Sequence, residues 1–242
     1  MSAPRITLYY DIVSPFAYIA FHVLKNSPTF AQCNVQYVPI LLGGLMQTCG
    51  NTPPINIKST TEPKLLDLIK IEFSQSLLPT DKDKWINQER LRWAKYFSVP
   101  VCANTPEGFP VRTLAVQRAM CAVSQKSPAK VEPVLDALYR SFWVERNSKI
   151  GEPAGFLPIL EGVLGKQEAQ DVLSAMGQPD IKAILSSNTD QAFKSGAFGL
   201  PWFECTNSKG ETEGFWGIDH LGQVADFLGL DRSVDKGFRA VL

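Results

Sequence analysis

The chain contains 242 residues, of which 45% are hydrophobic and 20% charged, so it can bury one sizeable core or two smaller ones separated by an insertion. Lysine plus arginine equals aspartate plus glutamate at 24 each, and the pI is near 6.7. This balance gives no electrostatic reason to expect a nucleic acid or an anionic membrane as a partner. No apolar run reaches the ~18 residues of a membrane span, and "MSAPRITLYY" lacks the apolar stretch of a signal peptide.

The five cysteines lie far apart, form no C-x-x-C pair and are odd in number. This pattern suits a reducing compartment better than a disulfide framework, and it offers no metal-type pairing. We therefore expect a cytoplasmic protein without a metal site. The final "AVL" is not the S-K-L peroxisomal address, although a mitochondrial or peroxisomal location stays open.

The N-terminal region predicts a strand, a helix and a second strand. "RITLYYDIV" (5–13) is rich in β-branched and aromatic residues, as is typical of a buried strand. Ser14 suits the position that caps a helix, and Pro15 suits the first helical position, which needs no N–H. "NVQYVPIL" (34–41) predicts a strand that ends near Gly43-Gly44. This order favours a parallel, right-handed βαβ unit.

The middle of the chain predicts helices. After a loop at "CGNTPPIN" (49–56), helical patterns continue to about residue 195, with a polar loop expected at "LLPTDKDKW" (77–85). The expected helical segments are residues 62–78, 86–98, 112–125, 130–145, 155–165, 166–176 and 179–196.

The C-terminal region predicts strands at "WFECTN" (202–207) and "TEGFWG" (212–217) and a last helix at "DHLGQVADFLGL" (219–230). Each end of the chain is too small to hold a core alone, and together they would make one four-stranded sheet. We therefore predict an α/β fold: a thioredoxin-like domain formed by residues 1–50 and 190–242, interrupted by a large all-helical insertion at residues 51–189.

Four motifs extend over nearly the whole chain: "LYYDIVSPFAYIAF" (8–21), "GNTPP" (50–54), "GAFGLP" (196–201) and "FWGIDHL" (215–221). With these motifs in this order, the chain resembles the kappa-class glutathione transferases and their bacterial relatives, the 2-hydroxychromene-2-carboxylate isomerases. The resemblance implies a DsbA-like thioredoxin fold and a homodimeric detoxification enzyme. It also implies glutathione, as co-substrate or catalytic thiol, and an electrophilic, largely apolar second substrate.

Ser14 stands where thioredoxin-like oxidoreductases place the first cysteine of C-x-x-C, and the four residues here are Ser-Pro-Phe-Ala. Dithiol exchange is therefore impossible at this position. A hydroxyl and free amides at a helix start suit a bound thiolate, and stabilising that anion by about 2 kcal/mol lowers a thiol pKa of ~8.5 by ~1.5. The resemblance implies this catalytic role, and a plain helix cap is the alternative.

The resemblance also places the backbone of glutathione. Pro201 stands where thioredoxin-like folds keep a cis-proline, so the N–H and C=O of Leu200 would pair with the cysteinyl part. At "WGID", the amides of Ile218 and Asp219 would hold the γ-glutamyl carboxylate, and the Asp219 carboxylate would meet the ammonium. Family transferases often have serine at the position of Ile218. His220 replaces a usual arginine and is read as a surface residue or a general base.

Asn51 of "GNTPP" would bond the peptide part of glutathione, unless it only forms a turn. The family uses a lysine for the glycyl carboxylate, and counting back from "RLRWAKYFSVP" gives Lys82 first and Lys84 second. Lys58 is a third candidate, because about 20 extra residues separate the motifs.

The second substrate leaves a weaker trace in the sequence. Arg112 either meets an acidic substrate or is a solvated residue at a helix start. Four aromatic residues are candidates for an apolar wall above the thiol, although most aromatics at helical spacing belong to a core. They are Trp85, Phe109, Phe142 and Trp143.

Three functions remain open from the sequence. The first is a kappa-type transferase, in which the thiolate attacks an electrophilic carbon and glutathione is consumed. The second is an isomerase of the hydroxychromene type, in which the thiolate adds and leaves again. The third is a DsbA-like module without redox activity, which would bind peptides beside the cis-proline.

Overall fold

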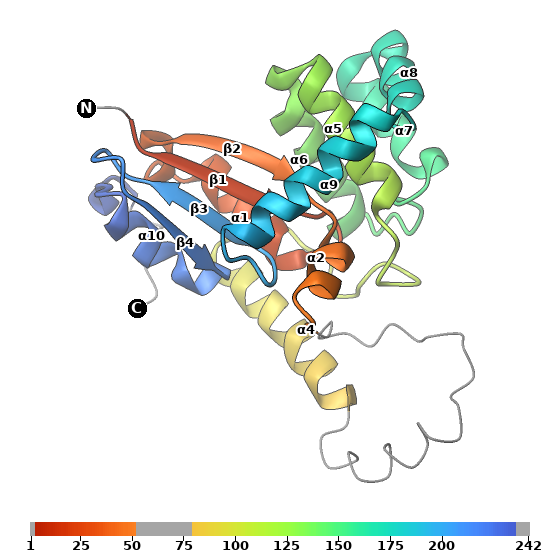
Figure 1. Cartoon of the computed structure of the whole chain (residues 1–242). Helices are drawn as coiled ribbons and strands as arrows, with labels where there is room; N and C mark the ends of the chain where they lie inside the picture. Colours follow the sequence, from red (N-terminus) through yellow and green to blue (C-terminus); the bar gives the residue numbers. More distant parts are fainter. Residues whose placement is uncertain (1–2, 52–78, 236–242) are drawn as a thin grey trace.

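The structure, a computed structural model, describes residues 3–51 and 79–235, with side chains from residue 84 onward in the second range. Its centre is a four-stranded sheet in the order β2-β1-β3-β4 (Figure 1). The strands are β1 (Arg5–Tyr10), β2 (Asn34–Pro39), β3 (Trp202–Thr206) and β4 (Thr212–Trp216). The predicted sheet, built from the two ends of the chain, is confirmed.

The register of the strands brings the candidate site together. β1 is parallel to β2, with Tyr10 opposite Pro39, and antiparallel to β3, with Tyr9 opposite Trp202. β4 is antiparallel to β3 and ends with Trp216 opposite Trp202. The segments that follow β1, β2 and β4 and the segment that precedes β3 therefore meet at one end of the sheet, which we call the carboxyl end of β1.

Helix α1 (Pro15–Asn26) begins at this end, as the sequence predicts. Ser14 is the N-cap residue, and its Oγ accepts a hydrogen bond from the Ala17 N–H at 3.2 Å. Such a cap contributes ~1 kcal/mol. Most of the helix is buried, from Ala17 to Leu24, so α1 packs into the core over most of its length.

Helix α2 (Leu42–Thr48) corrects the predicted end of the second strand. β2 ends at Pro39, and Gly43 and Gly44 lie inside α2. Glycine is a poor helix former, so the local sequence does not indicate this helix. Its first turn is capped from a distance, because the Leu42 N–H donates to Asp11 Oδ2 at 2.9 Å.

Between β2 and β3, and after β4, the described chain is helical, which confirms the helical insertion. The helices are α4 (Pro79–Tyr96), α5 (Leu114–Lys126), α6 (Val131–Trp143), α7 (Pro153–Leu164), α8 (Lys166–Ala175), α9 (Pro179–Lys194) and α10 (Leu221–Phe227). Short 3₁₀ turns occupy Phe30–Gln32, Pro128–Lys130, Ile218–His220 and Arg232–Val234.

The start of α4 differs from the prediction for this part of the insertion. The polar loop expected at 77–85 is wrong from Pro79 onward, because α4 begins there. Proline is tolerated at a helix start, and the charged stretch after it continues into the helical pattern of residues 86–98. The helix expected at 62–78 lies outside the described residues.

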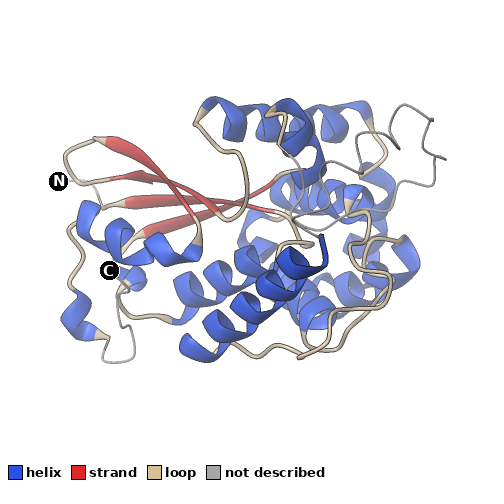
Figure 2. Ribbon diagram, turned by 90° about the horizontal axis from the view of Figure 1, so that it is seen from below, coloured by secondary structure: helices blue, strands red, loops and turns tan. Residues whose placement is uncertain are grey.

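Helices lie on both sides of the sheet (Figure 2), and α5, α7 and α8 pack against one another in a group that lies away from β3 and β4 (Figure 1). Aromatic rings join α6 to α1. The Tyr139 ring of α6 lies 5.1 Å from the Tyr18 ring and 5.5 Å from the Phe21 ring of α1. Among the described residues, no helix is both long and apolar enough to cross a membrane.

Candidate functional site

Ser14 lies at the turn between β1 and α1. The residue is 5% exposed, and its N–H donates to the Asp11 carbonyl at 3.0 Å. Within the described part of the chain, the Ser14 hydroxyl proton has no acceptor and the Phe16 N–H has none either. Two donors therefore point from the positive end of a 12-residue helix, an arrangement suited to an anion.

The Leu200–Pro201 peptide bond is cis. Pro201 directly precedes β3, and its carbonyl accepts a hydrogen bond from the Gly217 N–H at 3.0 Å. The N–H and C=O of Leu200 have no partner among the described residues. Because Trp202 pairs with Tyr9, this segment lies at the carboxyl end of β1, beside the turn that leads to Ser14. The free groups of Leu200 can pair with an extended, peptide-like ligand.

The turn after α2 is attached to the segment before Pro201. The Asn51 Nδ2 donates to the Phe198 carbonyl at 2.9 Å, and the Cys49 Sγ lies 3.5 Å from the Ala197 carbonyl. Asn51 is exposed and retains its Oδ1 and one N–H for a ligand. Asn51 therefore positions the cis-proline segment, a contact that the sequence analysis did not foresee.

The "WGID" segment begins with a 3₁₀ turn, Ile218–His220, and α10 starts only at Leu221. The predicted single helix from Asp219 is corrected in this respect. The Ile218 side chain is buried and Asp219 is exposed, and their two N–H groups have no acceptor in the described part. His220 Nδ1 lies 3.4 Å from Asp219 Oδ1, so His220 faces the predicted γ-glutamyl position.

Two of the three candidate lysines, Lys82 and Lys84, belong to α4. Lys82 lies in the first turns of α4, and its side chain is outside the described residues, as is the whole of Lys58. Lys84 is exposed on the same helix. Arg112 is also exposed, two residues before α5.

Three of the four aromatic residues predicted to form an apolar wall pack together, and the fourth, Trp85, lies on α4. Phe142 and Trp143 are fully buried, and the Trp143 Nε1 donates to the Ile12 carbonyl at 3.0 Å, so both belong to the core behind the Ser14 turn. Phe109 packs on Trp143, at 5.3 Å between ring centroids. Trp85 is 57% exposed on α4.

Two other aromatic side chains, missed in the sequence, are exposed at the carboxyl end of β1. Phe198 is 42% exposed and Trp216 is 45% exposed, with 4.8 Å between their rings. A Cβ at position 199 would lie 2.8 Å from Trp216 Nε1, so Gly199 lets the indole lie against the segment before Pro201. The sequence signal was their position inside "GAFGLP" and "FWGIDHL".

Asp11 is a second residue that the sequence analysis did not single out. It is 1% exposed, and burial raises the pKa of its carboxyl group to about 6, although hydrogen bonds, the Leu42 amide foremost, lower it. The sequence signal that could have found Asp11 was a single charged residue in the otherwise uncharged stretch "LYYDIVSPF".

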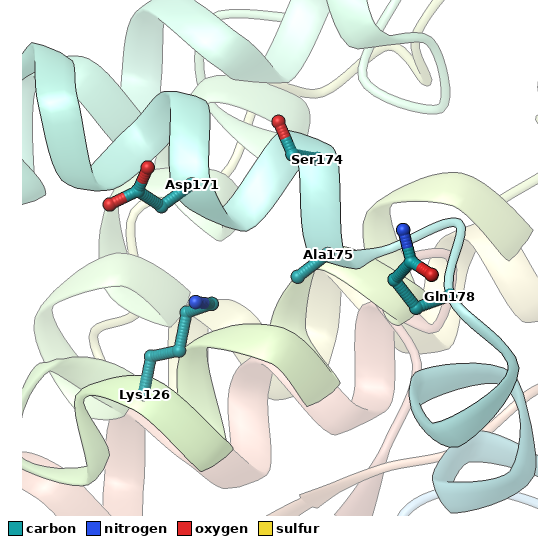
Figure 3. A pocket seen from close by; sticks show the side chains of 5 residues that line it. All are labelled: Lys126, Asp171, Ser174, Ala175 and Gln178. Atoms are coloured by element: carbon teal, nitrogen blue, oxygen red, sulfur yellow. The ribbon is translucent and has the colours of Figure 1, made fainter.

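A surface hollow of about 280 Å³ lies elsewhere, between α5 and α8 (Figure 3). Lys126, Asp171, Ser174, Ala175 and Gln178 line it. None of the residues discussed above borders it. Among the described residues no group of three His, Cys, Asp or Glu side chains could hold a metal ion.

The sheet, the helical insertion and the helix start define the class: a thioredoxin-like protein with Ser-Pro-Phe-Ala, and no cysteine, at the start of α1. Residues 5–229 match the family described as the DSBA-like thioredoxin domain, and the chain belongs to that family.

Sequence and structure comparisons agree with this assignment. The chain is 28% identical to glutathione S-transferase kappa 1 of Caenorhabditis elegans (93% of this chain, 91% of that protein). It is 27% identical to the Homo sapiens protein of the same name (93% and 92%). In structure it is similar to a 2-hydroxychromene-2-carboxylate isomerase, with a TM-score of 0.67 and 18% identity (93% and 94% coverage).

It is also similar to the cytosolic disulfide reductase DsbM from Pseudomonas aeruginosa, with a TM-score of 0.58 and 16% identity (93% and 95% coverage). At such identities the structural likeness shows the fold alone. The resemblance predicted from the four motifs is confirmed, and these relatives are named as enzymes, in line with the predicted enzyme.

Proposed function

We propose that the protein is a glutathione-dependent enzyme of the transferase type, in which Ser14 stabilises the glutathione thiolate for addition to an apolar electrophile. One observation carries the proposal. The Ser14 hydroxyl, the free Phe16 amide and the unpaired backbone of Leu200 lie at one end of the sheet, and the helix start Ser14-Pro15-Phe16-Ala17 carries no sulfur. The similarity to kappa-class transferases supports glutathione as the ligand.

The chemistry follows from the donors. The Ser14 Oγ accepts from the Ala17 N–H and can donate its own proton to a thiolate at the same time. The thiol proton leaves to solvent, the sulfur forms a bond to the electrophilic carbon, and any leaving group departs with the electron pair of the broken bond. Because Ser14 is buried, its hydrogen bond to the anion acts where little water competes.

The remaining parts of glutathione would bind complementary groups along the same end of the sheet. The cysteinyl backbone would pair with the N–H and C=O of Leu200, next to cis-Pro201. The γ-glutamyl carboxylate would accept from the amides of Ile218 and Asp219, and its ammonium would meet the exposed Asp219 carboxylate.

Asn51 and Lys82 complete this proposed set. The Asn51 side chain holds the Phe198 carbonyl and has one N–H and its Oδ1 left for the peptide part of glutathione. Lys82 would take the glycyl carboxylate, with Lys84 as the second choice.

The apolar substrate would contact Phe198 and Trp216. These two rings are exposed and in contact, and each is two residues away in sequence from a stretch proposed for glutathione: Phe198 precedes Leu200 and Trp216 precedes Ile218. By contrast, Phe142 and Trp143 are buried and offer no surface to a ligand. The pair favours a planar, conjugated substrate, since rings prefer offset or tilted contacts with other rings.

Isomerisation is the second candidate, and the "FWG" and "FPVRTLAVQRA" sequences favour it. The two reactions differ in the fate of the thiol. Stoichiometric loss of free glutathione with a chromogenic electrophile supports transfer. Altered product geometry with unchanged thiol supports isomerisation.

The assembly and domain division are also proposals. We expect a homodimer, which sedimentation velocity would test. The thioredoxin-like part would comprise residues 1–50 and 190–242, with 51–189 as the insertion.

The testing experiment is calorimetric titration of glutathione into wild-type protein and Ser14→Ala, with turnover of the electrophile measured in parallel. We expect both proteins to bind and the variant to lose at least tenfold in turnover. No binding by wild type would favour a peptide-binding module, and equal turnover would remove Ser14 from the mechanism.

A further inference from the structure

The Asp11 carboxylate contacts three segments at once. Oδ1 accepts a hydrogen bond from the Val13 N–H at 3.2 Å, and Oδ2 accepts one from the Leu42 N–H at 2.9 Å. The Thr113 hydroxyl and the Ile12 amide also donate to this carboxylate. One buried side chain therefore joins the Ser14 turn, the first residue of α2 and the residue before α5.

The contact on the Ser14 side fixes the turn itself. The Val13 N–H is bonded to the side chain of Asp11, and the Ser14 N–H is bonded to its main-chain carbonyl at 3.0 Å. Both bonds close the short stretch between β1 and α1. The main chain and the side chain of Asp11 therefore both hold the turn that carries Ser14.

The contact on the α2 side reaches the other half of the site. Leu41, the residue before α2, makes no side-chain cap, so Asp11 supplies an acceptor at the positive end of that helix. The helix ends at Thr48, Cys49 is its C-cap, and the Asn51 side chain just beyond donates to the Phe198 carbonyl. A rigid helical turn thus connects Asp11 to the segment that presents Leu200 and Pro201.

We propose that Asp11 is a positioning residue for glutathione binding, which sets the separation between the Ser14 hydroxyl and the cis-proline segment through α2. The proposal rests on the proposed function and deepens it. Glutathione would contact both ends of this connection, while Asp11 itself, buried beneath them, would not touch the ligand.

Leu42→Pro tests the connection without altering Asp11. Proline has no N–H and is compatible with the first helical position, and Leu41 already has the extended conformation that precedes proline. The variant therefore removes the Leu42–Asp11 hydrogen bond, together with a leucine side chain that packs partly buried against the core. Asp11→Asn is the companion variant, since an amide offers one acceptor oxygen where the carboxylate offers two.

Gln117→Met is the matched control. Gln117 is buried at the same end of the sheet, where its Nε2 donates to the Tyr10 carbonyl at 3.0 Å and the Ile40 carbonyl at 2.7 Å. The control loses two buried hydrogen bonds next to Asp11 but leaves both the Ser14 turn and the first N–H of α2 in place.

The measurements are glutathione affinity by calorimetry, the pKa of the bound thiol by thiolate ultraviolet absorbance, and the free energy of unfolding. We expect Leu42→Pro and Asp11→Asn to weaken binding at least fivefold and to raise the pKa of the bound thiol. Gln117→Met should lose comparable stability with affinity within twofold of wild type.

The inference is wrong if Leu42→Pro binds glutathione as wild type does, or if all three variants weaken binding in proportion to lost stability. If either Leu42→Pro or Asp11→Asn does not fold, the glutathione affinity of the other variant still tests the inference. A wild-type protein that binds no glutathione refutes the proposed function itself. Normal wild-type binding that is sensitive to Ser14→Ala and insensitive to Leu42→Pro refutes only the role of Asp11.

Discussion

At the scale of single residues, Ser14 joins two uses of one hydroxyl. Its oxygen accepts from Ala17 and begins α1, and its proton has no acceptor within the described chain. A residue that only caps a helix needs the oxygen alone. The free proton is therefore the part of Ser14 that capping leaves for a ligand.

Asp11 makes the stability depend on pH. Its pKa rises from an ordinary 3.8 to about 6 through burial, so the folded protein holds this proton more tightly. The protonated group stabilises the fold at low pH, and this contribution is lost as the pH rises through 6. Between pH 4.5 and 7 the loss is about 2 kcal/mol. Tyr10 and Tyr139 stay neutral, since burial raises their pKa values well above this range.

Urea denaturation of wild type and Asp11→Asn at the two pH values measures this contribution. At each pH, the free energy of unfolding of Asp11→Asn is subtracted from that of wild type. This difference should be about 2 kcal/mol larger at pH 4.5 than at pH 7. A difference that is the same at both pH values would contradict the assigned titration.

At the scale of elements, Arg90 attaches α4 to the rest of the insertion. The residue is 2% exposed, and its guanidinium donates to the Cys102 and Ala103 carbonyls at 2.9 and 2.7 Å. It also lies over the Trp143 ring, at 5.6 Å from the centroid. Because lysine lacks this planar fork, Arg90→Lys should lower the free energy of unfolding by ~2 kcal/mol.

Arg92→Lys is the control for that change. Arg92 lies on the same helix, but its side chain is 65% exposed and paired with Glu89. Exposed pairs contribute little, so the control should change stability by less than ~0.5 kcal/mol. Equal losses in chemical denaturation of both variants would remove Arg90 from this role.

At the scale of the whole molecule, Phe198, in the segment before β3, and Trp216, at the end of β4, are brought together by the pairing of Trp202 with Trp216. Trp216→Ala should raise the KM for an aromatic electrophile several-fold and leave glutathione affinity unchanged. Trp85→Ala, on α4, should change neither. Steady-state kinetics measures the KM of both variants for the aromatic electrophile. A larger rise in KM for Trp85→Ala than for Trp216→Ala would place the apolar substrate beside α4.

The fold was predictable where local pattern and global arrangement agree. The β-branched run before Ser14 and the proline after it indicated β1 and α1, and the helical spacing after residue 85 indicated the insertion. The start of α2 was not predictable, because Asp11 caps it from 31 residues away. Burial of Phe142 and Trp143 depends on tertiary packing, which helical spacing does not reveal.

The most direct test of the account is the pKa of the glutathione thiol bound to wild type, Ser14→Thr and Ser14→Ala, measured by thiolate ultraviolet absorbance. The account predicts a pKa near ~7 in wild type and in Ser14→Thr, which keeps a hydroxyl, and a return toward the free value of ~8.5 in Ser14→Ala with binding retained. The same pKa in wild type and Ser14→Ala would contradict the claim that Ser14 stabilises the thiolate.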